Sequence, residues 1–199
     1  MTSLSGIFPV LPTPFTQDGA IDATTLGSLV EFAVKAGADG VVYPGMASEV
    51  ETLSADERLT MVRALGAALG GRLPFIVGAS DADPARAAAR AEEGRAVGAK
   101  AAMIMAPAAN GADVAKHIAF YRAVAAATSL PIMLQNAPQP NGAGLSPAAV
   151  AEIVRAVSQI RFVKEETLPP GQHVTAILNA VGSQLDGVFG GAGARYIMD

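Results

Sequence analysis

The 199-residue sequence contains no cysteine. Disulfide bonds, thiolate nucleophiles and cysteine-ligated metal sites are therefore excluded, and cysteine usage does not constrain the redox compartment. Charged residues make up only 16% of the chain. The net charge of −4 and the pI near 5.2 are too mild and too acidic to predict binding to nucleic acid or to a membrane surface. Because no run of about 18 apolar residues occurs, we expect no membrane-spanning helix.

The first ten residues, MTSLSGIFPV, have neither a basic stretch nor a long apolar run. We therefore expect no signal peptide and a cytoplasmic location. What the chain does have is hydrophobic residues, at 51% of the total. That fraction is enough for one sizeable core, and we predict a single domain over residues 1–199.

Short β-type runs alternate along the chain with longer, alanine-rich helical runs. Most of the β-type runs are apolar throughout, which is typical of parallel strands covered on both faces. We predict strands at residues 6–15, 40–45, 74–80, 101–107, 131–138, 160–167 and 187–193. We predict helices at residues 22–36, 54–69, 84–97, 112–127, 146–157 and 171–181. Asp22, the pair Ser54 and Glu57, and the Ser146–Pro147 step are typical helix starts.

The βα unit recurs roughly every 30 residues, which is the size of a βα module. Seven strands in such a series favour an α/β fold of the (β/α)8 barrel class over an open doubly wound sheet. No G-x-G-x-x-G motif follows a strand, and the glycines of residues 187–193 have the wrong spacing for one. The chain ends where the helix after the seventh strand should begin. Because a barrel needs closure, we expect a barrel truncated after about seven modules and incomplete at its C-terminus.

The stretch IRFVKEET, at residues 160–167, places three charges at the end of a predicted buried strand. Strand alternation puts Lys164 and Glu166 on the same face and Glu165 on the other. The Cα atoms of Lys164 and Glu166 should be roughly 7 Å apart. Both lie near the carboxyl end of the strand, where barrel enzymes hold their active sites. We expect Glu165 to face the helix layer and to pair with an arginine there.

Lys164 is the candidate nucleophile. A lysine that loses hydration among apolar neighbours gives up its proton more readily, and its amine can then form a Schiff base with a ketone. The iminium acidifies the adjacent carbon, which permits either carbon–carbon cleavage or loss of water. Glu166 is the candidate proton shuttle. The alternative is a buried Lys–Glu pair that only stabilises the barrel.

Four stretches, in this order, resemble the dihydrodipicolinate synthase/N-acetylneuraminate lyase family of class I aldolase-type (β/α)8 enzymes. They are GIFPVLPTPFTQDGAID, GADGVVYPGMASEVETLSADER, PIMLQNAP and FVKEET. The second corresponds to the family stretch that usually reads G-[ST]-T-G-E, the third to Y-N-x-P, and the fourth to the strand that bears the Schiff-base lysine. The resemblance covers essentially the whole chain. It implies a longer protein that assembles as a tetramer.

The departures from the family pattern concern its usual proton relay of three hydroxyl groups. Gln135 replaces the tyrosine of Y-N-x-P, and Ala47 replaces the second hydroxyl residue of G-[ST]-T-G-E. The loop after the fourth strand reads PAAN, at residues 107–110, where the family usually has P-Y-Y-N. A glutamine does not titrate, so the usual relay cannot operate. The loop QPNGAG also lacks the arginine of the synthases, which argues against the synthase reaction.

The remaining pattern is similar to the L-2-keto-3-deoxyarabonate dehydratase branch of the family, in which a glutamine replaces the tyrosine and the lysine strand carries an extra glutamate. The resemblance implies dehydration of a 2-keto-3-deoxy sugar acid to 2,5-dioxopentanoate, a step of L-arabinose catabolism. Lys164, Glu166 and Gln135 would be catalytic, and no cofactor beyond the covalent lysine would be needed. Two alternatives stay open. One is a Schiff-base aldolase that releases pyruvate, and the other is a non-catalytic keto-acid binder.

We expect the substrate carboxylate to bind the turn Gly45–Met46–Ala47–Ser48, on the amides of Ala47 and Ser48 and with help from the Ser48 hydroxyl. The alternative is that Ser48 only caps the turn. Met46 and Met133 either line the pocket or pack in the core, and Asn136 orients Gln135 or the turn. His117 and His173 fall in predicted helices without an acidic cluster. We therefore expect them to be surface or packing residues and predict no metal site.

Overall fold

The structure, a computed structural model, describes residues 4–196 and 198. The chain divides into two compact units. The first comprises Met1–Ala79 and Arg90–Ala102, and the second comprises Ser80–Ala89 and Met103–Asp199. No helix among the described residues is long and apolar enough to cross a bilayer.

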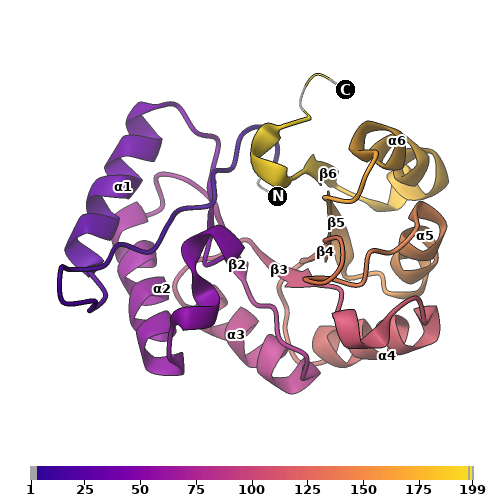
Figure 1. Cartoon of the computed structure of the whole chain (residues 1–199), viewed down its shortest axis with the longest axis horizontal. Helices are drawn as coiled ribbons and strands as arrows, with labels where there is room; N and C mark the ends of the chain where they lie inside the picture. The colour runs from indigo at the N-terminus through magenta and orange to yellow at the C-terminus, as the bar shows by residue number, and fades with distance from the viewer. Residues whose placement is uncertain (1–3, 197, 199) are drawn as a thin grey trace. The chain divides into compact units, whose positions relative to one another are not determined.

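The first unit contains α1 (Ala23–Lys35), β1 (Val41–Tyr43), α2 (Ala55–Leu69) and β2 (Phe75–Gly78). Strands β1 and β2 are parallel, with Val42 opposite Ile76. Helix α1 packs against α2 (Figure 1). Both strands are buried along their whole length, as expected for parallel strands covered on both faces.

Helix α3 (Pro84–Ala96) and strand β3 (Ala101–Met105) each have residues in both units. The second unit continues with α4 (Val114–Ala125), β4 (Ile132–Asn136), α5 (Pro147–Ala156), β5 (Ile160–Glu165), α6 (Pro170–Val181) and β6 (Gly187–Gly190). Strands β4, β5 and β6 pair in parallel in chain order. Helix α5 packs between α4 and α6, and α6 contacts β5 and β6 (Figure 1).

The predicted helix starts are confirmed at the level of hydrogen bonds. The Asp22 side chain accepts a hydrogen bond from the Thr25 amide at the start of α1. Ser54 and Glu57 form the reciprocal capping box of α2. Ser146 accepts from the Ala149 amide of α5. These starts were predictable because each cap depends on a side chain and an amide only three residues apart.

The predicted strand at residues 6–15 is wrong as a continuous strand. Only Val10 forms a parallel bridge, with Val42, where the Leu11 amide donates to the Val42 carbonyl and the Val42 amide donates to the Pro9 carbonyl. Three of the ten residues in this stretch are proline, which has no N–H for a ladder. The stretch therefore runs beside β1 but pairs with it at one point.

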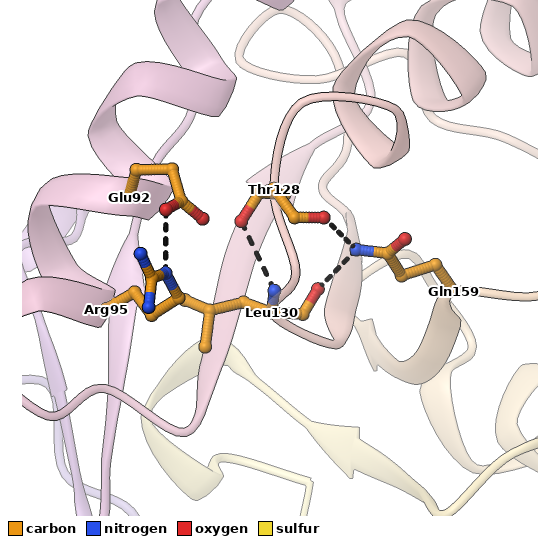
Figure 2. A network of polar contacts seen from close by, with 5 residues as sticks. All are labelled: Glu92, Arg95, Thr128, Leu130 and Gln159. Carbon is orange, nitrogen blue, oxygen red and sulfur yellow. Dashed lines mark hydrogen bonds and ion pairs between the residues drawn. The ribbon is translucent and has the colours of Figure 1, made fainter.

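A polar clamp holds the amino ends of β4 and β5 (Figure 2). The Gln159 side-chain amide donates to the carbonyls of Thr128 and Leu130, each at 2.7 Å, and the Leu130 amide donates to the Thr128 hydroxyl. The Ile132 amide also donates to the Gln159 carbonyl at 2.8 Å. The clamp fixes where β4 begins beside β5. Figure 2 also shows the ion pair between Glu92 and Arg95 of α3.

Candidate active site

A bulge in the pairing of β4 with β5 brings Gln135 beside Lys164. Ile132 pairs with Ile160, but the next pair is Met133 with Phe162, so the register shifts by one residue. Beyond the shift, Gln135 pairs with Lys164 and Asn136 with Glu165. Without it, Gln135 would lie opposite Val163, on the face away from Lys164, because a one-residue slip reverses every side chain.

The Glu166 carboxylate lies between Lys164 and Gln135. The Lys164 Nζ is 3.3 Å from Glu166 Oε1, and the Gln135 Nε2 donates to Glu166 Oε2 at 2.6 Å. The side chains of Lys164 and Glu166 are each 14% exposed, so the pair is shielded but still reached by solvent. The structure thus brings together the three residues predicted to be catalytic, all within the second unit.

The turn after β6 approaches the same carboxylate. The Ala192 amide donates to Glu166 Oε1 at 3.1 Å. A Cβ atom added at Gly191 would lie 2.3 Å from both Cγ and Oε1 of Glu166. Glycine is therefore needed at 191 for the close approach of backbone and carboxylate. In the sequence these glycines stand out only because their spacing does not fit a dinucleotide motif. The Gly190–Gly191 pair at the end of β6 is the signal for this close approach.

The arginine partner predicted for Glu165 is wrong. Glu165 is fully buried and makes no ion pair among the described residues. Its Oε2 accepts from the Asn136 Nδ2 at 2.8 Å, and its Oε1 accepts from the Thr167 amide at 2.7 Å and from the Thr167 hydroxyl. The Thr167 hydroxyl also contacts the Nδ1 of half-buried His173 at 2.7 Å. Alternation predicted the opposite face correctly but not what fills it.

Asn136 fixes the loop that follows β4. Its Nδ2 donates to the Leu145 carbonyl, and its Oδ1 accepts from the Leu145 amide, both at 2.9 Å. Asn136 is fully buried, so these bonds are protected from water. Of the two roles predicted for Asn136, the structure shows contact with the loop.

The turn Gly45–Ser48 lies in the first unit, where residues Met46–Ser48 form a short 3-10 helix. The Ser48 hydroxyl accepts from the Gly45 amide at 2.9 Å and donates to the Leu11 carbonyl at 2.6 Å. The Ser48 amide donates to the Gly45 carbonyl. Both hydrogens of Ser48 are therefore used to hold the turn, while Ala47 is exposed. Contact of the turn with a substrate stays a prediction.

Tyr43 supports the same turn through the side chain of Thr13. Its hydroxyl and the Thr13 hydroxyl are 2.9 Å apart, and the Thr13 hydroxyl donates to the Ser48 carbonyl at 2.6 Å. Burial raises the pKa of Tyr43 above its usual value, because the charged phenolate would lose its hydration.

The other candidate residues have varied surroundings. Met46 is 49% exposed, whereas Met133 is buried in the core. His117 is fully buried, and its Nε2 is 3.0 Å from the Gly111 carbonyl, which holds the loop after β3. Among the described residues, no three His, Asp or Glu side chains form a group that could hold a metal ion. The absence of a metal site stays a prediction.

The comparisons with known proteins agree on one family. The profile of the dihydrodipicolinate synthetase family matches residues 3–194. The chain is 32% identical over 198 residues to the L-2-keto-3-deoxyarabonate dehydratase of Azospirillum brasilense, which covers 97% of this chain and 63% of that protein. It is 37% identical over 152 residues to the 4-hydroxy-tetrahydrodipicolinate synthase of Xanthomonas axonopodis pv. citri. That alignment covers 76% of this chain and 50% of the synthase. The chain thus spans between half and two thirds of these relatives.

Solved structures show the same fold. A prophage protein of the dihydrodipicolinic acid synthase family from E. coli K12, crystallised with pyruvate, superposes with a TM-score of 0.86 at 25% identity, over 96% of this chain and 64% of that one. Dihydrodipicolinate synthase from Aquifex aeolicus superposes with a TM-score of 0.84 at 25% identity, over 94% and 63%. These likenesses confirm the predicted fold class, a truncated (β/α)8 barrel, here with six strands among the described residues.

Proposed function

Because the chain belongs to the dihydrodipicolinate synthetase family, we propose that the protein is a lyase that binds a 2-oxo acid covalently through Lys164. More finely, it dehydrates a 2-keto-3-deoxy sugar acid, with L-2-keto-3-deoxyarabonate as substrate and 2,5-dioxopentanoate as product. The observation that carries the proposal is the placement of the Glu166 carboxylate between Lys164 and Gln135. The similar A. brasilense protein carries the name of this dehydratase.

The reaction starts when the Lys164 amine attacks the C2 ketone and releases water to form an iminium. Glu166, as a carboxylate 3.3 Å from the amine, removes a proton from C3 and leaves an enamine. The enamine expels the C4 hydroxyl, which receives the proton from Glu166 and leaves as water. Loss of a proton from C5 and gain of a proton at C3 then move the C3–C4 double bond to C4–C5. The resulting enol takes a proton at C4 and loses the hydroxyl proton to become the aldehyde, and hydrolysis of the iminium frees the lysine.

Gln135 orients the leaving hydroxyl in this scheme. A carboxylate can only accept hydrogen bonds, so the Gln135 Nε2 faces Glu166 at 2.6 Å. The Gln135 Oε1 is then the atom that can accept from a substrate hydroxyl. One side chain thereby connects the proton donor to the group that it protonates.

Aldol cleavage is the second candidate, and a specific observation favours it. The similar E. coli prophage protein was crystallised with pyruvate, which is the product that a Schiff-base aldolase would release from a 2-keto-3-deoxy acid. Both reactions need the iminium at Lys164. They differ in whether the C3–C4 bond or the C4–O bond breaks.

Product analysis separates the two reactions. The protein is incubated with a panel of 2-keto-3-deoxy acids, and the products are identified by mass spectrometry. The dehydratase yields 2,5-dioxopentanoate, whereas pyruvate with an aldehyde would refute dehydration in favour of cleavage. Binding of the acids without an adduct after borohydride, and without products, would refute both and indicate a non-catalytic binder.

Glu166→Gln tests the proton shuttle. The variant should keep borohydride trapping at Lys164 while turnover falls about 10²- to 10⁴-fold, the usual effect of losing a general acid–base group. Glu152→Gln, at an exposed position of α5, is the matched control and should leave both unchanged. Turnover of Glu166→Gln within about tenfold of wild type would show that another group moves the proton.

The other parts of the proposal concern binding and assembly. The turn Gly45–Ser48 would hold the substrate carboxylate, with the Ala47 amide as donor, because both hydrogens of Ser48 are used within the turn. No cofactor beyond the covalent lysine would be needed. We also propose a cytoplasmic homotetramer, as the family resemblance implies.

A further inference from the structure

A second polar cluster lies at the ends of β4 and β5, behind the predicted catalytic residues. It consists of Asn136, Glu165, Thr167 and His173. Asn136 and Glu165 are fully buried, and Thr167 is 8% exposed. Because side chains alternate along a strand, Glu165, the last residue of β5, points away from the face that carries Lys164. Its carboxylate bonds Asn136 and Thr167 rather than Lys164, and none of the steps proposed above uses the cluster.

The cluster contains a buried carboxylate whose partners are neutral donors. Glu165 accepts three hydrogen bonds, from the Asn136 Nδ2 and from the amide and hydroxyl of Thr167. Since the Thr167 hydroxyl has one proton and gives it to Glu165, its oxygen accepts from the Nδ1–H of His173 at 2.7 Å. A buried carboxylate without a cation is costly compared with an apolar side chain. We therefore attribute to Glu165 a role in fixing the local backbone geometry rather than in net stability.

The hydrogen bonds of this cluster enclose Glu166. The Glu165 carboxylate accepts from the Thr167 amide, so this hydrogen bond joins the residues before and after Glu166. The Glu166 amide donates to the Asn136 carbonyl at 3.0 Å, and the Gly191 amide donates to the Glu165 carbonyl at 3.1 Å. These hydrogen bonds fix the backbone of Glu166, from which the side chain extends to Lys164.

We propose that Glu165 is a positioning residue, which holds Glu166 against Lys164 through its bonds to Asn136 and Thr167. The inference rests on the proton-shuttle role proposed for Glu166. Glu165 does not contact the reacting atoms. It fixes the direction of the peptide from which the shuttle projects, and a displacement of about 1 Å at a reacting group can cost about 10²-fold in rate.

A double-mutant cycle tests this role. The probe is 2-oxobutanoate in D2O, and the readout is deuterium exchange at its C3, followed by proton NMR. Borohydride trapping at Lys164 is measured in parallel. Exchange needs the iminium and the proton shuttle but not the loss of water, so at unchanged trapping it reports on the proton transfer assigned to Glu166. The variants are Glu165→Gln, Glu166→Gln and the double variant.

Glu165→Gln should slow exchange about 10- to 100-fold and leave trapping unchanged, because the amide replaces an acceptor with a donor that faces other donors. In the Glu166→Gln background the same change should slow exchange less than threefold, since a residue that acts through Glu166 has nothing left to position. Effects that multiply in the double variant would overturn the proposal. So would exchange by Glu165→Gln within threefold of wild type.

A second pair of variants covers the case in which Glu165→Gln does not fold. Thr167→Val removes the hydroxyl that holds Glu165, and Thr167→Ser keeps it. Exchange should fall in the valine variant and return with serine, again only when Glu166 is present. Equal exchange in the two variants would overturn the proposal.

The outcomes distinguish this inference from the proposed function. If Glu166→Gln exchanges as fast as wild type, the shuttle role is wrong and the positioning role falls with it. If Glu166→Gln is slow but Glu165→Gln and Thr167→Val are not, the positioning role alone is wrong. If the exchange pattern is as expected but no 2,5-dioxopentanoate forms from any sugar acid, the dehydratase assignment alone is wrong.

Discussion

Replacing Gly191 with alanine should displace Glu166 from Lys164. The added Cβ would lie 2.3 Å from Cγ and Oε1 of Glu166, whereas favourable contacts of carbon atoms begin at about 3.5 Å. The carboxylate must therefore retreat by about 1 Å, which breaks a 3.3 Å ion pair and a 2.6 Å hydrogen bond to Gln135. A 1 Å misplacement of a reacting group costs about 10²-fold, so we expect C3 exchange of a 2-oxo acid to slow by about that factor.

Gly190→Ala is the matched control for this variant. Neither glycine has a positive φ, so the two positions differ mainly in what an added Cβ would meet. A Cβ at Gly190 meets nothing within 4 Å. Its exchange rate should stay within about twofold of wild type, and borohydride trapping should be unchanged in both variants. Equal exchange by Gly191→Ala and Gly190→Ala would refute the view that the carboxylate position governs proton transfer.

Two further predictions concern stability. Ser48→Ala leaves the Gly45 amide and the Leu11 carbonyl without their hydroxyl partner. We expect urea titration to show a free energy of unfolding lower by about 1–3 kcal/mol. An unchanged value would contradict the view that Ser48 holds the turn. Burial raises the pKa of Tyr121 well above the usual tyrosine value of 10.0. Its contribution to stability is therefore present below pH 10 and falls as pH rises further, because only the unfolded chain then loses the proton. Above pH 10, wild type should lose up to about 1.4 kcal/mol per pH unit more than Tyr121→Phe, and parallel losses in urea titrations would contradict this.

Features that depend on near neighbours in the chain could be predicted from the sequence. The caps at Asp22, Ser54 and Ser146 each join residues three apart, and all three form as expected. Alternation along one strand likewise predicts that Lys164 and Glu166 share a face, and their side chains are in contact. The strand at residues 6–15 was over-predicted because its apolar residues outweighed its prolines.

Features that depend on pairing between strands could not be predicted. Gln135 reaches Glu166 only because the register shifts between Ile132 and Met133. Neither residue type predicts a bulge. Glu165 was expected to pair with an arginine, but its partners include Asn136 on the neighbouring strand. Packing between elements decides which side chains contact the second face of a strand. The sequence of one strand does not contain this information.

The central claim is that the Lys164 amine bonds covalently to the C2 carbon of a 2-oxo acid. It is tested most directly by incubating the protein with 2-oxobutanoate, reducing with borohydride and mapping the modified peptide by mass spectrometry. The account predicts one adduct, on Lys164, and none in a Lys164→Ala variant. An unmodified Lys164, or an adduct on Lys35, Lys100 or Lys116 instead, would contradict it.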